Sequence, residues 1–161
     1  MSEDERYRRG VGVVLINDDR LVWTGRRIDY TDEAWQMPQG GIDDGEEPWT
    51  TALRELEEET GIAPCFVEKL AEAPELLRYD LPAELRGELW KGRYVGQIQN
   101  WFLARFHGSD TDIDIATEHP EFSHWRWSTP DDAIRLIVPF KRTMYQRIFD
   151  MFGEWLEPEL S

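Results

Sequence analysis

The stretch that decides the fold runs from Gly40 to Ile62 and reads GGIDDGEEPWTTALRELEEETGI. A loop that contains three glycines leads into a segment dense in glutamate. Pro48 suits the first turn of a helix, where its missing N–H leaves no hydrogen bond unmade. Gly61 suits the end of a helix, because glycine accepts the positive φ that helix ends often adopt. The sequence therefore predicts a loop followed by a helix that starts near Pro48 and stops at Gly61.

This predicted helix has an apolar face and an acidic face, because a helix turns once in about 3.6 residues. The apolar stripe, which should pack on a core, consists of Trp49, Ala52, Leu53, Leu56 and Thr60. The acidic face carries Glu55, Glu58 and Glu59, whose mutual repulsion costs a few tenths of a kcal/mol per pair. Mg²⁺ or Mn²⁺ would offset this repulsion, since both prefer oxygen ligands and leave room for phosphate oxygens. The alternative is a solvated acidic face, which is the usual meaning of a charge run.

The spacing of the whole stretch resembles the Nudix box, the signature of the Nudix hydrolases. Its defined positions carry Gly40, Glu46, Arg54-Glu55-Leu56, Glu58-Glu59 and Gly61-Ile62. The resemblance implies an α/β fold, the Nudix α/β/α sandwich with a mixed sheet, and an enzyme that hydrolyses phosphoanhydride bonds. Strands flanked by helices, as the rest of the chain predicts, favour the same architecture.

The neighbours of the glutamates have roles that follow from their chemistry. Arg54 lies four residues before Glu58, so it can pair with that carboxylate and orient it. Glu46 stands at the start of the helix, where a negative charge suits the macrodipole. The predicted metal ligands are the Gly40 carbonyl, which no Cβ obstructs, and the carboxylates of Glu55, Glu58 and Glu59. Which glutamate acts as the general base stays open, because basicity depends on geometry and burial.

The composition describes one acidic globular domain. The chain has 161 residues, of which 40% are hydrophobic and 32% charged, and its net charge is −15. This length suits a single domain that spans residues 1–161. The negative charge opposes non-specific binding to polyanions, so we expect no DNA partner and, for RNA, a local basic patch. The eight tryptophans include candidates for stacking on nucleobases.

Cys65 stands alone, so no internal disulfide can form, which fits a reducing compartment. We predict that this cysteine is a small buried side chain and not a nucleophile. The chain has no apolar run long enough for a transmembrane helix, and its first residues are polar and acidic, unlike a secretory signal. We therefore expect a cytoplasmic monomer without a membrane partner.

Apolar runs and turn residues predict a set of strands closed by two helices. The expected strands cover residues 10–16, 20–27, 35–38, 66–71, 75–81, 93–107 and 122–127. The first two should form a hairpin around a turn at 17–19, and residues 82–92 should form a loop. Thr129 suits the cap of a helix at 129–137, and a second helix should cover 140–155.

The acidic loop at 108–120 contains a false calcium signal. The ligand spacing of an EF-hand loop is matched by Asp110, Asp112, Asp114 and Glu121. That loop requires glycine at its sixth position, where this chain has Ile115. The residues before the loop predict a strand, whereas an EF-hand needs a helix there, so we reject this interpretation.

Motifs beyond the box are similar to those of the bacterial RNA 5′-pyrophosphohydrolases. The lead-in to the box is shared with the plant-type asymmetric diadenosine tetraphosphate hydrolases. The motifs are Tyr7-Arg8, Val11-Gly12, Trp35-Gln36-Met37-Pro38-Gln39, Leu77-Arg78-Tyr79, Gly96-Gln97 with Gln99, Trp101-Phe102-Leu103, Pro120-Glu121-Phe122, Trp125-Arg126-Trp127 and Phe140-Lys141-Arg142. They cover most of residues 7–147, with 128–137 less similar.

This resemblance implies roles for residues outside the box. Glu121 would be an additional carboxylate at the site, either a metal ligand or the base that activates water. The implied substrate contacts are, on the phosphate side, Arg8, Arg27, Gln39, Tyr79 and Lys141, and, around a base, Val138 and Phe140. If these residues converge, an acidic protein gains one positive mouth that attracts a polyphosphate end.

We therefore predict an Mg²⁺- or Mn²⁺-dependent RNA 5′-pyrophosphohydrolase, which removes pyrophosphate from triphosphorylated RNA, leaves a 5′ monophosphate and exposes the RNA to decay. The alternative is the same chemistry on diadenosine tetraphosphate, giving ATP and AMP. A third hypothesis is a Nudix-fold binding module without catalysis. The intact Arg54, Glu55, Glu58 and Glu59 argue against it, since such modules usually have broken boxes.

Overall fold

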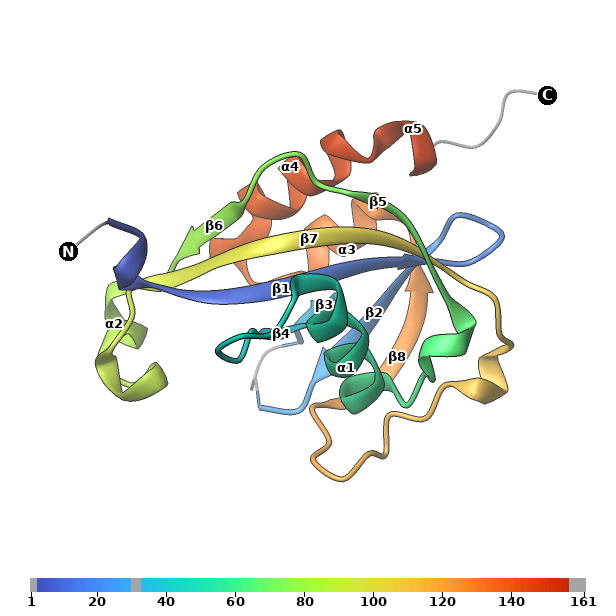
Figure 1. Ribbon diagram of the computed structural model, residues 1–161, viewed down its shortest axis with the longest axis horizontal. Coiled ribbons are helices and arrows are strands. Elements are labelled where there is room, and N and C mark those ends of the chain that lie inside the picture. Colours follow the sequence, from blue (N-terminus) through green and yellow to red (C-terminus); the bar gives the residue numbers. More distant parts are fainter. Residues whose placement is uncertain (1–2, 30–32, 157–161) are drawn as a thin grey trace.

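The chain folds around a mixed sheet of eight strands with helices on both faces (Figure 1). The computed structural model describes residues 3–29 and 33–156. The strands are β1 (Tyr7–Ile16), β2 (Val22–Arg27), β3 (Trp35–Gln36), β4 (Gln39–Gly41), β5 (Val67–Glu72), β6 (Leu77–Asp80), β7 (Gly96–Phe106) and β8 (Phe122–Ser128). The α-helices are α1 (Pro48–Thr60), α2 (Ala83–Arg86), α3 (Pro130–Leu136), α4 (Arg142–Met151) and α5 (Gly153–Leu156). Short 3₁₀ turns are η1 (Glu3–Arg6), η2 (Pro64–Phe66), η3 (Leu89–Gly92), η4 (Asp110–Asp112) and η5 (Pro139–Lys141).

Two parallel strands, β1 and β7, form the centre of the sheet. Their register runs from Tyr7 opposite Gly96 to Ile16 opposite Arg105. The other strand pairs are antiparallel, and the main path through the sheet is β3-β2-β1-β7-β5. The residues of β1 from Gly10 onward are all buried, as expected for a strand that is covered on both faces. The predicted α/β fold with a mixed sheet is confirmed.

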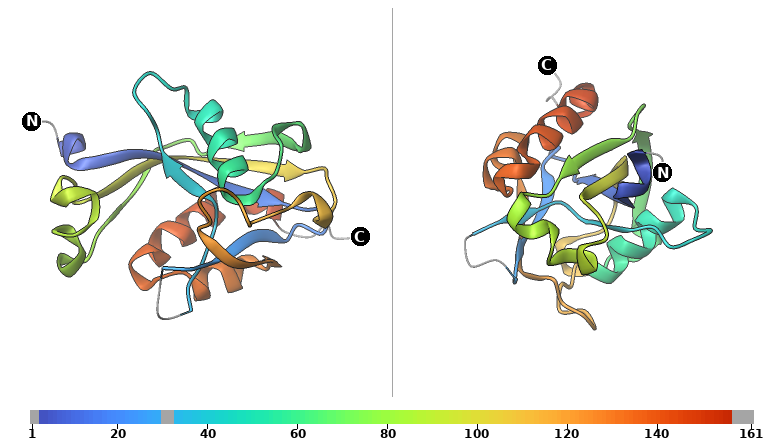
Figure 2. Two further views of the ribbon diagram at one scale, coloured as in Figure 1. Left: turned by 90° about the horizontal axis from the view of Figure 1, so that it is seen from below. Right: turned by 90° about the vertical axis from the view of Figure 1, so that its left-hand side faces the viewer.

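Figure 2 shows α1 on one face of the sheet and α3, α4 and α5 on the other. Each face has its own hydrophobic core, because successive residues of a strand point to opposite faces. Val13 of β1 therefore packs in the core with Leu56 of α1. Its neighbour Val14 packs in the opposite core with Tyr145 of α4. None of the helices in the described ranges is both long and apolar enough to cross a lipid bilayer.

Several strand predictions need correction. β1 begins at Tyr7, before the predicted Gly10, because its pairing with β7 already starts there. β7 itself begins at Gly96 instead of residue 93. The predicted hairpin of the first two strands is reduced to one residue pair, Ile16 opposite Val22. β2 instead pairs along its length with β8, a long-range partner that local pattern does not reveal.

The predicted loop at 82–92 contains short helical segments, and the predicted helix at 140–155 is broken into separate segments. The loop region contains α2 and η3. The terminal helix is replaced by η5, α4 and α5, with Phe152 (φ −103°, ψ 14°) ending α4. Cys65, which we predicted to be buried, is exposed because it lies in η2, ahead of the outer strand β5.

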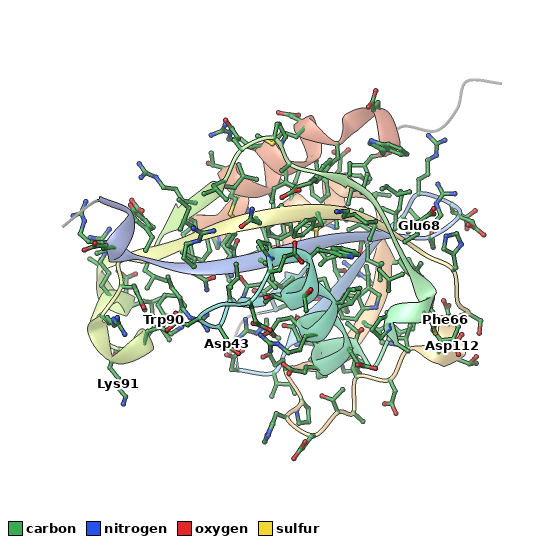
Figure 3. The ribbon with its side chains drawn as sticks, viewed as in Figure 1. Asp43, Phe66, Glu68, Trp90, Lys91 and Asp112 are labelled. Atoms are coloured by element: carbon green, nitrogen blue, oxygen red, sulfur yellow. The ribbon has the colours of Figure 1, made fainter. Side chains whose placement is uncertain are left out.

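Two aspartates of the acidic loop, Asp110 and Asp112, form hydrogen bonds that stabilise the structure of the loop. Asp112, labelled in Figure 3, accepts a hydrogen bond from the Ser109 backbone N–H at 2.8 Å and so caps η4. Asp110 accepts a hydrogen bond from the Trp127 indole at 3.0 Å, which ties the loop to β8. Asp110 and Asp112 therefore have structural roles in this loop.

Candidate active site

A cleft of about 580 Å³ opens between the glycine loop, the C-terminal half of α1 and the turn that precedes α4. Its polar lining consists of Arg8, Arg27, Asp29, Gln39, Gly40, Gly41, Glu55, Glu58, Tyr79, Gln97, Glu121 and Lys141, and its apolar lining of Leu81, Leu85, Leu89, Trp90 and Phe140. Most of the residues that we predicted for the site therefore share one space. Arg54 and Glu59 support it from α1, and Val138 does not line it.

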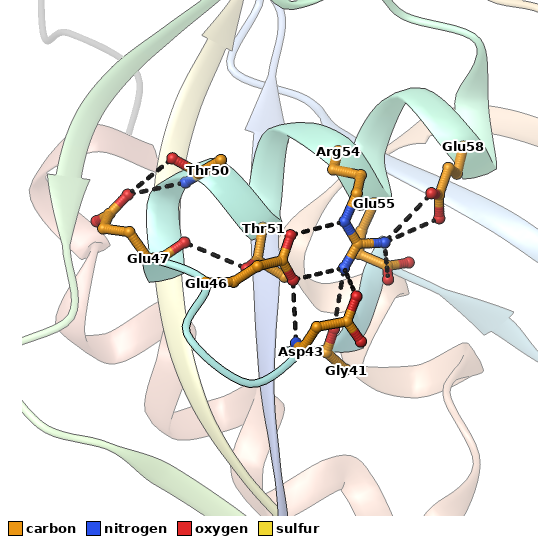
Figure 4. Close-up of polar contacts among 9 residues, drawn as sticks. All are labelled: Gly41, Asp43, Glu46, Glu47, Thr50, Thr51, Arg54, Glu55 and Glu58. Carbon is orange, nitrogen blue, oxygen red and sulfur yellow. Dashed lines mark hydrogen bonds and ion pairs between the residues drawn. The ribbon is translucent and has the colours of Figure 1, made fainter.

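The start of α1 holds Arg54 in place (Figure 4). Glu47 caps the helix, because its carboxylate accepts the Thr50 backbone N–H at 3.0 Å. Glu46, which we predicted at the helix start, lies one residue before this cap. It accepts two hydrogen bonds from Arg54, at 2.8 and 2.9 Å. This bonding lowers the pKa of Glu46 to about 2. The helix start thus anchors the guanidinium that reaches the acidic face.

The third nitrogen of Arg54, Nη1, faces the predicted metal ligands. It lies 3.0 Å from a carboxylate oxygen of Glu55 and 3.2 Å from Glu58. The predicted pairing of Arg54 with Glu58 is therefore confirmed and extends to Glu55. Burial raises the pKa of Glu55 to about 7, against the opposing effect of Arg54.

The three box glutamates differ in environment, which their spacing did not reveal. Glu58 is exposed, Glu55 is half-buried and Glu59 is only 2% exposed. One oxygen of Glu59 accepts the Gln39 backbone N–H at 3.1 Å, while Oε1 has no hydrogen-bond partner among the described residues. Burial, followed by the nearby charge of Glu121, raises the pKa of Glu59 well above its ordinary value. A buried carboxylate oxygen without a partner is costly, which a cation ligated there would relieve.

Gly40 lies directly against this carboxylate cluster. A Cβ at this position would overlap the carboxylate of Glu55, so only glycine lets the loop backbone approach so closely. The close approach brings the backbone of the glycine loop beside the predicted ligands.

The site fits a divalent metal by its donor chemistry. Within residues 3–29 and 33–156, no three His, Cys, Asp or Glu side chains are grouped tightly enough to hold an ion as they lie. The carboxylates stay apart because their like charges repel one another and because Arg54 forms ion pairs with Glu55 and Glu58. Glu55, Glu58 and Glu121 nevertheless line both the main cleft and an adjoining acidic hollow of about 390 Å³. The donors are all oxygens, which Mg²⁺ and Mn²⁺ prefer.

The opposite wall of the cleft is cationic and aromatic. Lys141 is buried, and its Nζ donates to Oε1 of Gln36 at 3.1 Å, while Arg27 donates to the same oxygen at 3.2 Å. Burial, followed by the charge of Arg27, lowers the pKa of Lys141 to about 7. The Lys141 ammonium lies 4.9 Å from the ring centre of Tyr79, and the rings of Tyr79 and Phe140 are 5.8 Å apart. Gln36 thus holds two cations on one wall.

Trp90 and Gln97 are cleft residues that we did not predict for the site, and the others are Asp29, Gly41, Leu81, Leu85 and Leu89. Arg8 lies over the ring of Trp90, 5.3 Å from its centre, and Trp90 comes from η3 in the segment that we predicted as a loop (Figure 3). Gln97 of β7 also lines the cleft. The high number of tryptophans indicated surfaces for stacking on nucleobases but did not show where they lie. The alternation of Gln97 and Gln99 was the sequence signal for Gln97.

Val138 has a different position. It directly precedes η5 and packs against the core under α4. Its contact with a base stays a prediction.

Comparison with known proteins agrees with this geometry. The NUDIX domain family profile matches residues 6–148. A protein of Dinoroseobacter shibae named RNA pyrophosphohydrolase is 57% identical over 150 residues, which are 93% of this chain and 94% of that one. A protein of Erythrobacter litoralis with the same name is 55% identical over 152 residues, 93% of both chains. The crystal structure of a C. elegans Ap4A hydrolase binary complex shares the fold, with a TM-score of 0.66 at 20% identity, and covers 91% of this chain and 98% of its own.

Nudix hydrolases generally use divalent metals, which suits the oxygen-lined end of the cleft. Gly40, Glu55 and Glu58 of the box lie at that end of the cleft, and the family profile covers residues 6–148. The chain belongs to the Nudix hydrolase family.

Proposed function

We propose that this Nudix hydrolase is an RNA 5′-pyrophosphohydrolase, which releases pyrophosphate from triphosphorylated RNA and leaves a 5′ monophosphate. Relatives with this name are 55% and 57% identical over 93% of the chain. The observation that carries the proposal is that carboxylates such as Glu55 and cations such as Lys141 line one cleft of about 580 Å³. A polyphosphate needs metal ligands on one side and positive charge on the other.

Mg²⁺, or Mn²⁺ in its place, is the proposed cofactor. The residues that would hold it are Gly40, through its carbonyl, and Glu55, Glu58, Glu59 and Glu121, through their carboxylates. A bound divalent ion neutralises charge on phosphoryl oxygens and lowers the pKa of a bound water. Arg54 keeps Glu55 and Glu58 oriented through its hydrogen bonds to both. One of the glutamates would accept the proton of the attacking water.

The substrate contacts lie across the cleft from the carboxylates. Lys141 and Arg27, held together by Gln36, would bind the phosphate chain from one wall. Arg8, which rests on Trp90, would bind it from another. The exposed face of Phe140 beside Tyr79 offers a surface on which a nucleobase can stack.

Diadenosine tetraphosphate is the second candidate substrate. It also presents a polyphosphate next to a nucleoside, so the same cations and aromatic rings would bind it. The names of the relatives favour RNA. The deciding measurement compares turnover of triphosphorylated RNA and of diadenosine tetraphosphate under identical conditions. RNA that releases neither pyrophosphate nor phosphate, at enzyme levels that cleave the dinucleotide, would exclude the RNA proposal.

The metal-ligand proposal has a separate test. Glu58→Gln keeps the size of the side chain and removes its charge, so turnover should fall by about two orders of magnitude or more while folding is preserved. Glu72→Gln is the matched control, because Glu72 is exposed on β5, away from the cleft. Turnover of Glu58→Gln that equals that of Glu72→Gln would rule out the metal role of Glu58.

Three further expectations remain proposals. They are that residues 1–161 act as a single Nudix domain, that the protein is a monomer, and that it works in the cytoplasm. The lone Cys65 agrees with a reducing compartment. Size-exclusion chromatography with light scattering would test the oligomeric state.

A further inference from the structure

Three glutamines and a tryptophan form a connected hydrogen-bond chain beside the cleft. The Trp101 indole N–H donates to Oε1 of Gln99 at 3.0 Å. Nε2 of Gln99 donates to Oε1 of Gln39 at 2.7 Å and to Oε1 of Gln97 at 2.9 Å. Gln97 and Gln99 are both buried, at 1% and 0% exposed, and Gln39 is half-buried. Gln39 and Gln97 also line the cleft, whereas Gln99 does not.

The chemistry of the indole sets the direction of every bond in this chain. An indole N–H can only donate, so it requires the oxygen of the Gln99 amide. The Gln99 NH₂ group must then face Gln39 and Gln97, and its two hydrogens are used by their two oxygens. Each of these outer amides has one oxygen, which is bonded to Gln99, so its NH₂ group is left for other acceptors. No acceptor for Nε2 of Gln97 lies among the described residues.

The sheet is built to accommodate this chain. Gln97, Gln99 and Trp101 alternate along β7, so their side chains share one face. The parallel neighbour β1 has glycine where these side chains need space. A Cβ at Gly10 would press on Oε1 of Gln97, and a Cβ at Gly12 would overlap the Trp101 ring.

We propose that Trp101 and Gln99 are positioning residues that orient the amides of Gln39 and Gln97 as a pair of N–H donors to the substrate polyphosphate. This inference rests on the proposed function, because it assigns the polyphosphate to this cleft. Phosphate oxygens can only accept hydrogen bonds, so two outward NH₂ groups bind them and two outward carbonyls would repel them. Trp101, buried in the core, thereby determines the polarity of a cleft that it does not line.

Two substitutions test the proposal, with inorganic pyrophosphate and Mg²⁺ as the probe in calorimetry. Gln97→Glu keeps an oxygen that can accept from Gln99 and replaces the outward NH₂ with a negatively charged acceptor oxygen. It should raise the Kd for pyrophosphate by about tenfold or more, equivalent to ~1.4 kcal/mol. Trp101→Phe removes the indole donor and frees the glutamines to rotate, and it should raise both this Kd and the KM by about three- to tenfold, with kcat changed by less than about twofold.

Trp23→Phe is the matched control. Trp23 is another fully buried tryptophan of the same sheet, it packs in the opposite core, and its indole nitrogen has no hydrogen-bond partner among the described residues. Its substitution removes the same atoms from a core but no directing N–H, so the Kd for pyrophosphate should stay within about twofold of the wild-type value.

The proposal is overturned if Trp101→Phe and Trp23→Phe change the Kd equally, or if Gln97→Glu leaves it unchanged. Circular dichroism verifies folding of each variant, and if Trp101→Phe does not fold, the result for Gln97→Glu decides alone. Pyrophosphate binding does not depend on RNA turnover. A wild-type protein that binds pyrophosphate as expected but cleaves no triphosphorylated RNA would therefore refute the proposed function and leave this inference intact.

Discussion

Arg54 and Glu46 form a two-point ion pair, in which Nε of Arg54 lies 2.9 Å from one carboxylate oxygen of Glu46 and Nη2 lies 2.8 Å from the other. Glu46 belongs to the loop before α1, and Arg54 lies within the helix. The pair therefore ties the glycine loop to the helix that carries the acidic cluster. It also fixes the guanidinium so that its remaining nitrogen faces Glu55 and Glu58.

This pair predicts a pH-dependent contribution to stability. The pKa of Glu46 falls from 4.5 to about 2 in the folded protein, chiefly because Arg54 donates hydrogen bonds to it. A lowered pKa means that the stabilisation is present above pH 4.5 and is lost as the pH falls through 2. Glu46→Gln should lower the urea midpoint at pH 7, and its difference from wild type should shrink as the pH falls below 4.5. Asp44→Asn, at an exposed neighbour in the same loop, is the control; an equal midpoint change in both variants would contradict the prediction.

We expect position 40 to require glycine, because it lies directly against the Glu55 carboxylate. Gly40→Ala places a methyl group on the Glu55 carboxylate, so this ligand must move. We expect turnover and Mg²⁺ affinity to fall by about 10- to 100-fold, the range typical of disturbed ligand support. Calorimetry with Mg²⁺ and steady-state kinetics measure the two effects. The control is Gly87→Ala, because a Cβ at Gly87 would meet no atom within 4 Å; similar losses in both variants would refute the steric explanation.

We expect the buried Lys141 to lower the stability of the fold while it contributes to substrate binding. Its pKa is about 7 in the folded protein against the ordinary 10.5, so the unfolded state binds more protons between these pH values. The free energy of unfolding attributable to this group therefore rises with pH across that window, and the cost of burying the charge is complete below pH 7. Lys141→Met should raise the melting temperature most below pH 7 and progressively less towards pH 10.5.

The same substitution should weaken the binding of pyrophosphate, because it removes a cation from the cleft wall. Lys91→Met, at an exposed lysine of η3, should change neither property. A melting-temperature gain that does not vary with pH would show that lost burial of charge is not its cause.

We expect substitutions of the neighbouring β1 residues Arg8 and Arg9 to have different effects on KM. Arg8 lines the cleft and rests on Trp90, whereas Arg9 is exposed and donates to Asn100 at 3.2 Å. Arg8→Ala should raise KM for triphosphorylated RNA by about tenfold, as expected for losing a charged hydrogen bond. Arg9→Ala should leave KM near the wild-type value. Comparable KM values in the two variants would show that general positive charge, and not the position of Arg8, matters.

Local features of the site were predictable from the sequence. Pro48 and Gly61 bound α1 as expected, with Gly61 at φ 72°, because helix ends depend on residues close in the chain. Arg54 pairs with Glu58 for the same reason, since residues four apart lie on one helical face. The apolar positions Ala52 and Leu56 are buried as their periodicity predicted.

Distant contacts decided the rest. The three box glutamates look alike in the sequence, yet the chain buries Glu59 against Gln39 and leaves Glu58 exposed. Lys141 and Arg27 both donate to one oxygen of Gln36. Lys141 lies 105 residues from Gln36 in the sequence, and Arg27 lies nine residues from it. Local pattern cannot show which strand covers a carboxylate or which amide lies between two cations.

The sequence by itself determined the family, the helix that carries the acidic cluster and the order of chemical groups along the chain, because these follow from spacing over one or two helical turns. Only the tertiary structure decided which of these groups are buried, which share the cleft and which way the amides of Gln39 and Gln97 point. The physical reason is that burial and hydrogen-bond direction depend on neighbours brought together by the parallel pairing of β1 with β7, which no short stretch of sequence specifies.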